Sequence, residues 1–175
     1  VTGLFGGTFD PIHEGHIQLA KSLLDHYPFK KILFIPNNQN PLKPNRAMAS
    51  NELRLQMVEA ALIETNEPRF ECSRVEIDRS APSFMIDTVG LLKGKYSEPL
   101  VLIIGNEVFQ TFTDWKNIKG LLEAISVIVV KRNQNYVVNV NELLEKHHIS
   151  TLRDKFPRIQ EFVTDVLDLS STELR

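Results

Sequence analysis

Two glycines and two histidines near the start of the chain have the residue types and spacing for phosphate or metal chemistry. The stretch GGTFDPIHEGH begins with Gly6 and Gly7, and its histidines, His13 and His16, are three residues apart. Glycines at a strand end let the backbone approach a ligand closely, and the N-terminus of a helix just beyond them attracts an anion. Histidines three apart are neighbours on one helical turn. They could bind a metal or donate hydrogen bonds to phosphate oxygens.

Phosphate binding fits these residues better than metal binding. A metal would need a third ligand, and beyond Asp10 no further cluster of cysteine or histidine follows. The dinucleotide fingerprint G-x-G-x-x-G and the P-loop are both absent, which disfavours nicotinamide or flavin oxidoreductases and P-loop enzymes. A tight strand-to-helix turn without any ligand remains the alternative explanation of the glycines.

The elements that must position these residues alternate between short apolar runs and helical patterns. Strands are expected at Val1–Phe5, Lys31–Pro36, Phe70–Ile77, Pro99–Ile104, Ile125–Val130 and Phe162–Leu169. Helices are expected at His16–Tyr27, Ser50–Glu64 with Ser50 as N-cap, Ser83–Tyr96, Glu107–Phe112, Asn117–Ala124 and Asn141–His148. The Asn- and Pro-rich segment Asn37–Asn45 is expected to be a loop. This alternation predicts a Rossmann-like α/β fold, a doubly wound parallel sheet with helices on both faces. Pro99–Ile104, the most apolar run, is the expected central strand.

Length and composition set broad limits on the protein. A chain of 175 residues fits one domain with a sizeable core. The net charge of -2 gives no sign of a nucleic-acid or membrane partner, and no signal peptide or membrane span is visible. The single cysteine, Cys72, fits a reducing compartment. We therefore expect a soluble cytoplasmic domain, and its oligomeric state stays open.

Five motifs resemble those of one enzyme family, in the same order along the whole chain. GGTFDPIHEGH resembles the signature of nucleotidyltransferases with the HxGH motif, and its wording is similar to that of the bacterial nicotinate mononucleotide adenylyltransferases. The other similar segments are FIPNNQNPLKPN, PSFMIDT, LIIGNEVFQTFTDW and the terminal LSSTELR. The resemblance implies one nucleotidyltransferase domain over residues 1–175, with a C-terminal helical tail to follow Arg175 as it does in the family.

The implied reaction joins ATP to nicotinate mononucleotide and releases pyrophosphate, giving deamido-NAD for NAD biosynthesis. A phosphate oxygen of the mononucleotide attacks the α-phosphorus of ATP. Because a phosphomonoester has a second pKa of about 6, that oxygen is largely anionic at neutral pH and needs no general base. The enzyme must therefore position the two substrates and stabilise the charge on the transferring and leaving groups. Mg²⁺ bound with ATP is the implied cofactor, with no protein metal ligand assigned.

The resemblance also assigns roles to individual residues on the ATP side. His13 and His16 would contact ATP phosphates, Lys43 would reach a phosphate, and Arg175 would clamp the β- and γ-phosphates. The backbones of Gly6, Gly7, Thr8 and Phe9 would line the junction of the two nucleotides. Gly105, Glu107, Ser170, Ser171 and Thr172 complete the implied ATP site. Ser170 and Glu173 also match a helix capping box, which is compatible with phosphate binding.

The mononucleotide side is where this chain departs most from the family pattern. Trp115 would stack on the pyridine ring, and Met85 and Lys116 are assigned beside it. Met85 replaces a threonine whose hydroxyl helps to hold the nicotinate carboxylate, so only its backbone N–H is kept. Leu42 replaces a phosphate-binding histidine, and Glu107 replaces an aspartate. Four arginines are interpreted as solvated or structural: Arg46, Arg54, Arg74 and Arg79. His26, His147, His148 and Cys72 match no motif and are interpreted as structural.

Two alternative functions remain open at this stage. Another acceptor, such as nicotinamide mononucleotide or phosphopantetheine, would use the same ATP chemistry. Trp115 favours a pyridine ring over a pantetheine arm, because an aromatic ring stacks on it. A nucleotide-binding module without turnover is the alternative from a different class. The intact set of His13, His16, Lys43 and Arg175 speaks against it.

Overall fold

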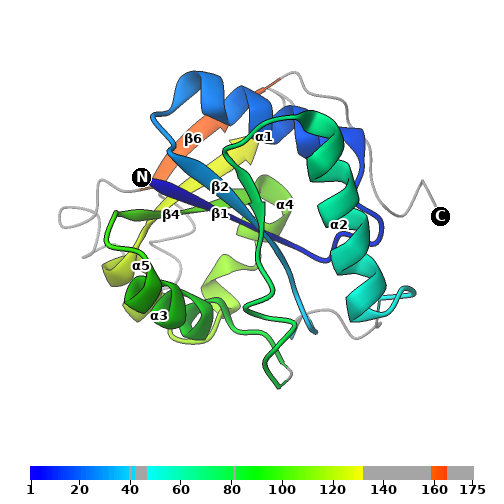
Figure 1. Ribbon diagram of the computed structural model, residues 1–175. Helices are drawn as coiled ribbons and strands as arrows, with labels where there is room; N and C mark the ends of the chain where they lie inside the picture. The colour runs from blue at the N-terminus through cyan, green and yellow to red at the C-terminus, as the bar shows by residue number, and fades with distance from the viewer. Residues whose placement is uncertain (40, 42–46, 81, 132–158, 165–175) are drawn as a thin grey trace.

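A six-stranded parallel β-sheet is the centre of the computed structural model (Figure 1). The structure describes residues 1–39, 41, 47–80, 82–131 and 159–164. The strands are β1 (Thr2–Gly7), β2 (Lys31–Pro36), β3 (Phe70–Cys72), β4 (Leu100–Gly105), β5 (Ser126–Lys131) and β6 (Ile159–Val163). The helices are α1 (Glu14–His26), α2 (Asn51–Thr65), α3 (Met85–Lys95), α4 (Asn106–Phe109) and α5 (Ile118–Ala124), with a 3₁₀ turn, η1 (Phe112–Asp114), before α5.

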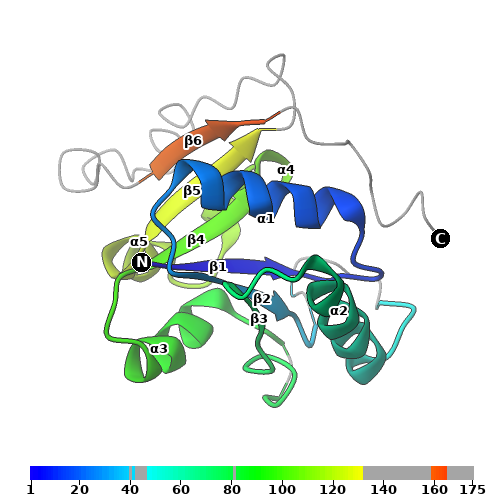
Figure 2. The ribbon, with the colours of Figure 1, turned by 45° about the horizontal axis from the view of Figure 1, so that its top comes forward.

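Helices cover both faces of this sheet, and each face has its own apolar cluster. On one face, Phe34 and Ile103 pack with α1 and α2 residues such as Leu23 and Val58. On the other face, Leu102 packs with residues of α3, α4 and α5. Figure 2 shows α1 and α3 on opposite sides of β1. The predicted doubly wound parallel sheet is therefore confirmed. Within the described ranges, no helix is long and apolar enough to cross a membrane.

The strand order fixes where a ligand would bind. The order is β3-β2-β1-β4-β5-β6, and every neighbouring pair is parallel. The chain winds outward in both directions from β1 and β4, so these two strands are central, and the predicted central position of Pro99–Ile104 is confirmed. In such sheets ligands bind at the carboxyl ends of the strands, where the order reverses. Gly7 ends β1 and Gly105 ends β4, so both lie at that point.

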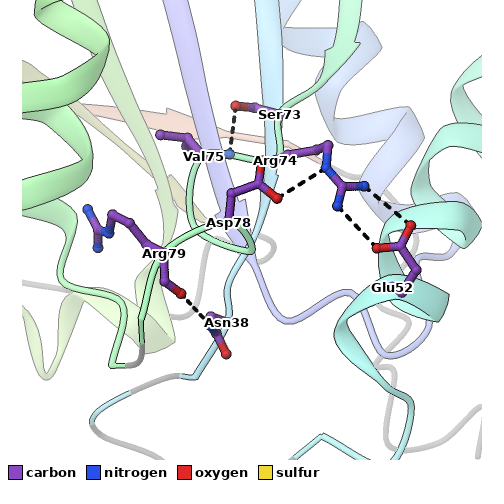
Figure 3. Close-up of polar contacts among 7 residues, drawn as sticks. All are labelled: Asn38, Glu52, Ser73, Arg74, Val75, Asp78 and Arg79. Atoms are coloured by element: carbon purple, nitrogen blue, oxygen red, sulfur yellow. Dashed lines mark hydrogen bonds and ion pairs between the residues drawn. The ribbon is translucent and has the colours of Figure 1, made fainter.

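Several element boundaries differ from the sequence prediction, among them that of the helix predicted at Glu107–Phe112, which ends at Phe109 as α4. β1 continues to Gly7, so the two glycines belong to the strand itself. α1 begins at Glu14. The prediction that β3 runs to Ile77 is wrong, because the chain turns after Cys72, with the Asp78 N–H donating to the Arg74 carbonyl at 2.9 Å. Arg74 binds Glu52 of α2 and Asp78, which holds this turn against α2 (Figure 3).

The last strand also lies earlier than predicted. β6 is Ile159–Val163 and pairs with β5 in parallel. Its polar residues Gln160 and Glu161 interrupt the apolar pattern, so sequence alone places its start at Phe162. Glu161 accepts a hydrogen bond from Lys131 of β5 at 2.6 Å, which explains an acidic residue in this edge strand. The predicted helix Asn141–His148 and residues 165–169 lie outside the described residues.

Ser50 is the N-cap of α2, as the sequence predicts. Its side chain accepts a hydrogen bond from the Leu53 N–H at 3.2 Å. We expect Ser50→Ala to cost about 1 kcal/mol of stability and to lower the Tm by about 2–4 °C for a chain of this size. Thermal unfolding followed by circular dichroism measures the effect. The exposed Ser97, which caps no helix, gives the control Ser97→Ala, and equal shifts for both variants would contradict the capping role.

Candidate functional site

The turn between β1 and α1 is held in an unusual backbone conformation by a buried aromatic ring. Phe9 has φ of 48°, in the left-handed region that few non-glycine residues adopt. Its ring is 2 % exposed and packs against Phe5, Phe34 and His16 at centroid distances of 5.7, 5.9 and 5.1 Å. A Cβ atom at position 7 would lie 2.9–3.1 Å from this ring, so Gly7 is the residue that fits. Core packing thus fixes the backbone at Gly7 and Thr8.

The two histidines of the HxGH motif stack on each other at the start of α1. Their ring centroids are 3.7 Å apart, His13 is the N-cap residue of α1, and it is buried. The backbone N–H of His13 donates to Nδ1 of His16 at 3.2 Å. Because Nδ1 accepts this bond, the neutral His16 ring carries its proton on Nε2. The fold therefore orients His16 to act as a hydrogen-bond donor through Nε2.

Asp10 is occupied by backbone groups of the segment before α2. Its Oδ2 accepts from the Met48 N–H at 2.8 Å, and its Oδ1 accepts from the Ala49 N–H at 3.2 Å. The carboxylate is 4 % exposed and joins the turn after β1 to the start of α2. Both oxygens accept hydrogen bonds from backbone N–H groups, so Asp10 is a structural anchor of this turn. No group of three potential metal ligands of the His, Cys, Asp or Glu type occurs in the described part of the chain.

The first turn of α3 lies beside the β1 glycines. A Cβ atom at position 6 would lie 3.2 Å from the methyl carbon of Met85, so Gly6 makes room for this side chain. Behind the same turn, Thr88 donates to the buried carboxyl of Glu76 at 2.7 Å. Burial raises the pKa of Glu76, and the hydrogen bond from Thr88 opposes that shift. Two residues that the sequence predicts for the site, Gly6 and Met85, therefore lie side by side in the structure. Glu76 holds the helical turn that carries Met85 through its hydrogen bond with Thr88.

Trp115 and Lys116 approach the same region from the turn after η1. Trp115 is half-buried, with its ring 5.1 Å from that of Phe112, and it packs against the same apolar cluster as Met85. Lys116 forms an ion pair with Asp87 of α3 at 3.2 Å, and its Nζ lies 4.5 Å from the centroid of the Phe84 ring. The residues predicted for the mononucleotide therefore gather around the first turn of α3.

Gly105 and Glu107 lie at the carboxyl end of β4, which neighbours β1 in the sheet. Gly105 is the N-cap residue of α4, and a Cβ atom added to it would meet no atom of the described residues within 4 Å. Glu107, on α4, is exposed. Both residues thus stand at the β4 carboxyl end with open space before them. The predicted site residues Lys43, Ser170, Ser171, Thr172 and Arg175 lie outside the described residues.

Two polar residues at the turn were not singled out by sequence reasoning. Asn37, after β2, donates through its N–H to the Gly7 carbonyl at 2.9 Å and through Nδ2 to the Thr8 hydroxyl at 3.3 Å. Arg54 of α2 is fully buried and donates to the Thr8 carbonyl at 2.6 Å. The sequence left open whether Arg54 is solvated or structural, and the structure shows that it is structural. A signal for Arg54 exists in the sequence: it precedes the buried Val58 and Leu62 by four and eight residues, on one helical face.

Comparisons with known proteins support one family. The chain matches the cytidylyltransferase-like family over residues 4–175. It is 37 % identical over 171 residues to a probable nicotinate-nucleotide adenylyltransferase of Aquifex aeolicus, covering 97 % of this chain and 98 % of that protein. It is 34 % identical to a protein of the same name from Roseiflexus castenholzii, covering 99 % of this chain and 83 % of the relative.

A solved structure has the same fold. It is the Plasmodium falciparum nicotinic acid mononucleotide adenylyltransferase complexed with NaAD, with a TM-score of 0.74 and 16 % identity. The match covers 98 % of this chain and 80 % of that one.

Proposed function

This chain belongs to the cytidylyltransferase-like family and to the nicotinate-nucleotide adenylyltransferases, and on that premise we propose that it transfers the adenylyl group of ATP to nicotinate mononucleotide. The products are deamido-NAD and pyrophosphate, and the reaction belongs to NAD biosynthesis. The observation that carries this proposal is the 37 % identity with the Aquifex aeolicus relative over almost the full length of both chains.

The reaction is a displacement at phosphorus. A phosphate oxygen of the mononucleotide forms a bond to the α-phosphorus of ATP, and the bond from that phosphorus to the bridging oxygen breaks, which releases pyrophosphate. The attacking oxygen is already anionic because the second pKa of a phosphomonoester is about 6. The protein must therefore bring two polyanions together and stabilise the charge that moves to the leaving group.

The ATP side of the site would be built on the turn between β1 and α1. The Nε2–H of His16 and the ring of His13 would donate to ATP phosphates, and the α1 N-terminus would add its positive end. The backbones of Gly6, Gly7, Thr8 and Phe9 would line the junction between the nucleotides. Gly105 and Glu107 would contact the ribose, and Lys43, Ser170, Ser171, Thr172 and Arg175 are assigned to phosphates by their positions in the motifs.

The mononucleotide side would be the first turn of α3 with the turn after η1. Trp115 would stack on the pyridine ring, and the backbone N–H of Met85 would donate to the nicotinate carboxylate. Lys116 lies beside Asp87 and Phe84 of this turn and would add a positive charge near that carboxylate. Because a hydrogen bond from the Met85 N–H to a carboxylate is charge-assisted, an acidic pyridine is favoured over its amide.

A divalent cation acts in this family together with ATP, and we propose Mg²⁺, entering as the MgATP complex. Mg²⁺ prefers oxygen ligands and keeps several waters. The described turn offers imidazole nitrogens and backbone N–H groups, whereas its one carboxylate, Asp10, is occupied by backbone donors. The phosphate oxygens of the substrate are therefore the proposed ligands.

The same proposal includes the domain organisation of the chain and its location in the cell. We propose that residues 1–175 form one nucleotidyltransferase domain, supported by a family match that begins at residue 4 and runs to residue 175. We also propose a cytoplasmic location, for which the support is the single cysteine in the sequence.

Pyrophosphate release tests the reaction and its acceptor. With ATP and Mg²⁺, we expect turnover with nicotinate mononucleotide and a kcat/KM about tenfold lower with the nicotinamide form, because charge-assisted hydrogen bonds are stronger than neutral ones. Phosphopantetheine should give none. No release with either pyridine mononucleotide would overturn the proposed function. A preference for nicotinamide mononucleotide would overturn the acceptor alone, and ATP binding without any turnover would favour a binding module.

A further inference from the structure

Arg54 is a charged residue at a place where α2 otherwise buries apolar side chains. Its exposed fraction is 0 %, and Leu55, Val58 and Leu62 of the same helix are buried with it. Removing a charge from water costs several kcal/mol unless its hydrogen bonds are well satisfied. Burial lowers the pKa of Arg54, although the nearby Asp10 raises it. A leucine would fill an apolar site at less cost, so the guanidinium must do something that a leucine cannot.

The guanidinium joins three segments through short hydrogen bonds. Nη1 donates to the Thr8 carbonyl at 2.6 Å. Nη2 donates to the Asn37 carbonyl and to Oδ1 of Asn51, each at 2.6 Å. The planar guanidinium presents its donors in a fixed arrangement, so it sets the separation of the groups that it binds. Arg54 thus fixes the turn after β1 against the loop after β2.

These two segments are the ones that surround the proposed reaction centre. The Thr8 carbonyl immediately precedes Phe9, whose φ of 48° makes the turn costly to hold. The Asn37 carbonyl immediately precedes Asn38, whose N–H donates to the Ser83 hydroxyl at 3.0 Å. The Nδ2 of Asn38 donates to the Arg79 carbonyl at 2.7 Å (Figure 3). Ser83 lies just before α3, which carries Met85. Arg54 is therefore bonded directly to the turn of the proposed ATP side. Through the loop after β2, it is also connected to the segment before α3 on the proposed mononucleotide side.

We propose that Arg54 is a positioning residue for adenylyl transfer, which holds the Thr8 turn and the Asn37 loop at the separation that aligns the two reacting phosphates. The inference rests on the proposed function. Arg54 is buried and acts through backbone carbonyls, so it touches neither substrate. A displacement of about 1 Å at a reaction centre costs about a hundredfold in rate. Loss of Arg54 should therefore lower kcat much more than it weakens binding of either nucleotide.

The test compares Arg54→Met and Arg54→Lys with Arg74→Met as matched control. Arg74 also contacts α2, through Glu52, but it lies on the surface. We expect kcat to fall about a hundredfold in Arg54→Met and about tenfold in Arg54→Lys, which keeps charge and donors, with each KM changed less than about fivefold. Arg74→Met should stay within about twofold of wild type.

Calorimetry with a non-hydrolysable ATP analogue separates positioning from simple loss of folded protein. The proposal requires a stoichiometry near that of wild type in the variants while kcat falls. A kcat of Arg54→Met within about threefold of wild type would overturn it. A fall in stoichiometry that equals the fall in kcat would also overturn it, as would the failure of both variants to fold, since Arg54 would then serve folding alone. A wild-type protein without turnover would overturn the proposed function itself.

Discussion

Replacement of His16 by alanine lowers kcat by about a hundredfold or more while the protein stays folded. Removal of one preorganised donor to charge that develops in a transition state has this cost. His16 is preorganised in two ways: its ring stacks on His13 at 3.7 Å, and its Nδ1 accepts from the His13 N–H at 3.2 Å. The proton on Nε2 therefore needs no rearrangement before the reaction. Alanine keeps the α1 helix but removes this donor.

Steady-state pyrophosphate release gives kcat, and thermal unfolding gives the stability of the variant. The Nδ1 acceptor is part of the cap of α1, so we expect the Tm to fall by about 2–4 °C, as for other capping losses. His26→Ala is the matched control, because His26 lies at the other end of α1, where its Nδ1 bonds to the Ser22 carbonyl at 2.8 Å and its ring packs against Phe162 of β6. Its kcat should stay within about twofold of wild type. A His16→Ala enzyme with nearly unchanged kcat would show that the phosphate role is wrong.

The histidine pair also shows how far sequence reasoning extends into the site. The motif placed His13 and His16 on one turn, which is a local property that spacing predicts. The sequence disfavoured a metal because no further cluster of cysteine or histidine follows beyond Asp10, and it could not show what Asp10 itself contacts. Its two oxygens bind the N–H groups of Met48 and Ala49, nearly 40 residues along the chain, and no local pattern contains that contact. The fold alone shows that Asp10 joins this turn to the segment before α2.

Most of the sheet was predictable because its strands are buried on both faces. β2 and β4 are nearly continuous apolar runs, as expected of central parallel strands. The two edge strands were predicted less well. β3 ends where Arg74 turns toward Glu52, and β6 begins with residues whose polarity suits an edge. At an edge, tertiary contacts rather than periodicity decide where pairing stops.

Arg54 is the clearest case of what one sequence cannot show. Its position on the buried face of α2 is visible in the spacing to Val58 and Leu62, but an arginine at such a position is usually read as reaching toward solvent. Only the assembled fold brings the Thr8 and Asn37 carbonyls to its two ends. A buried polar residue that positions a site through backbone carbonyls leaves no motif in the sequence, because backbone atoms are the same at every position.

Replacement of Trp115 by alanine raises the KM for nicotinate mononucleotide by about tenfold to a hundredfold and leaves the KM for ATP nearly unchanged. An aromatic ring stacked on a base is worth about 1–3 kcal/mol by alanine substitution. Trp115 is half-buried: its ring packs against Phe112 and the apolar cluster, and the side chain is not fully covered. Trp115→Phe keeps an aromatic face and should therefore raise the KM for nicotinate mononucleotide less than Trp115→Ala does.

Two measurements separate stacking from core packing. Tyr96, at the end of α3, packs partly buried against the same apolar cluster as Trp115, but it lies at the end of α3 away from Met85. Tyr96→Ala should therefore lower the Tm as Trp115→Ala does, without a change in the KM for the mononucleotide. Trp115 is also the only tryptophan, so nicotinate mononucleotide should quench the intrinsic tryptophan fluorescence of the wild-type protein. An equal rise in KM for both variants, or fluorescence unaffected by saturating mononucleotide, would show that Trp115 serves the core rather than the substrate.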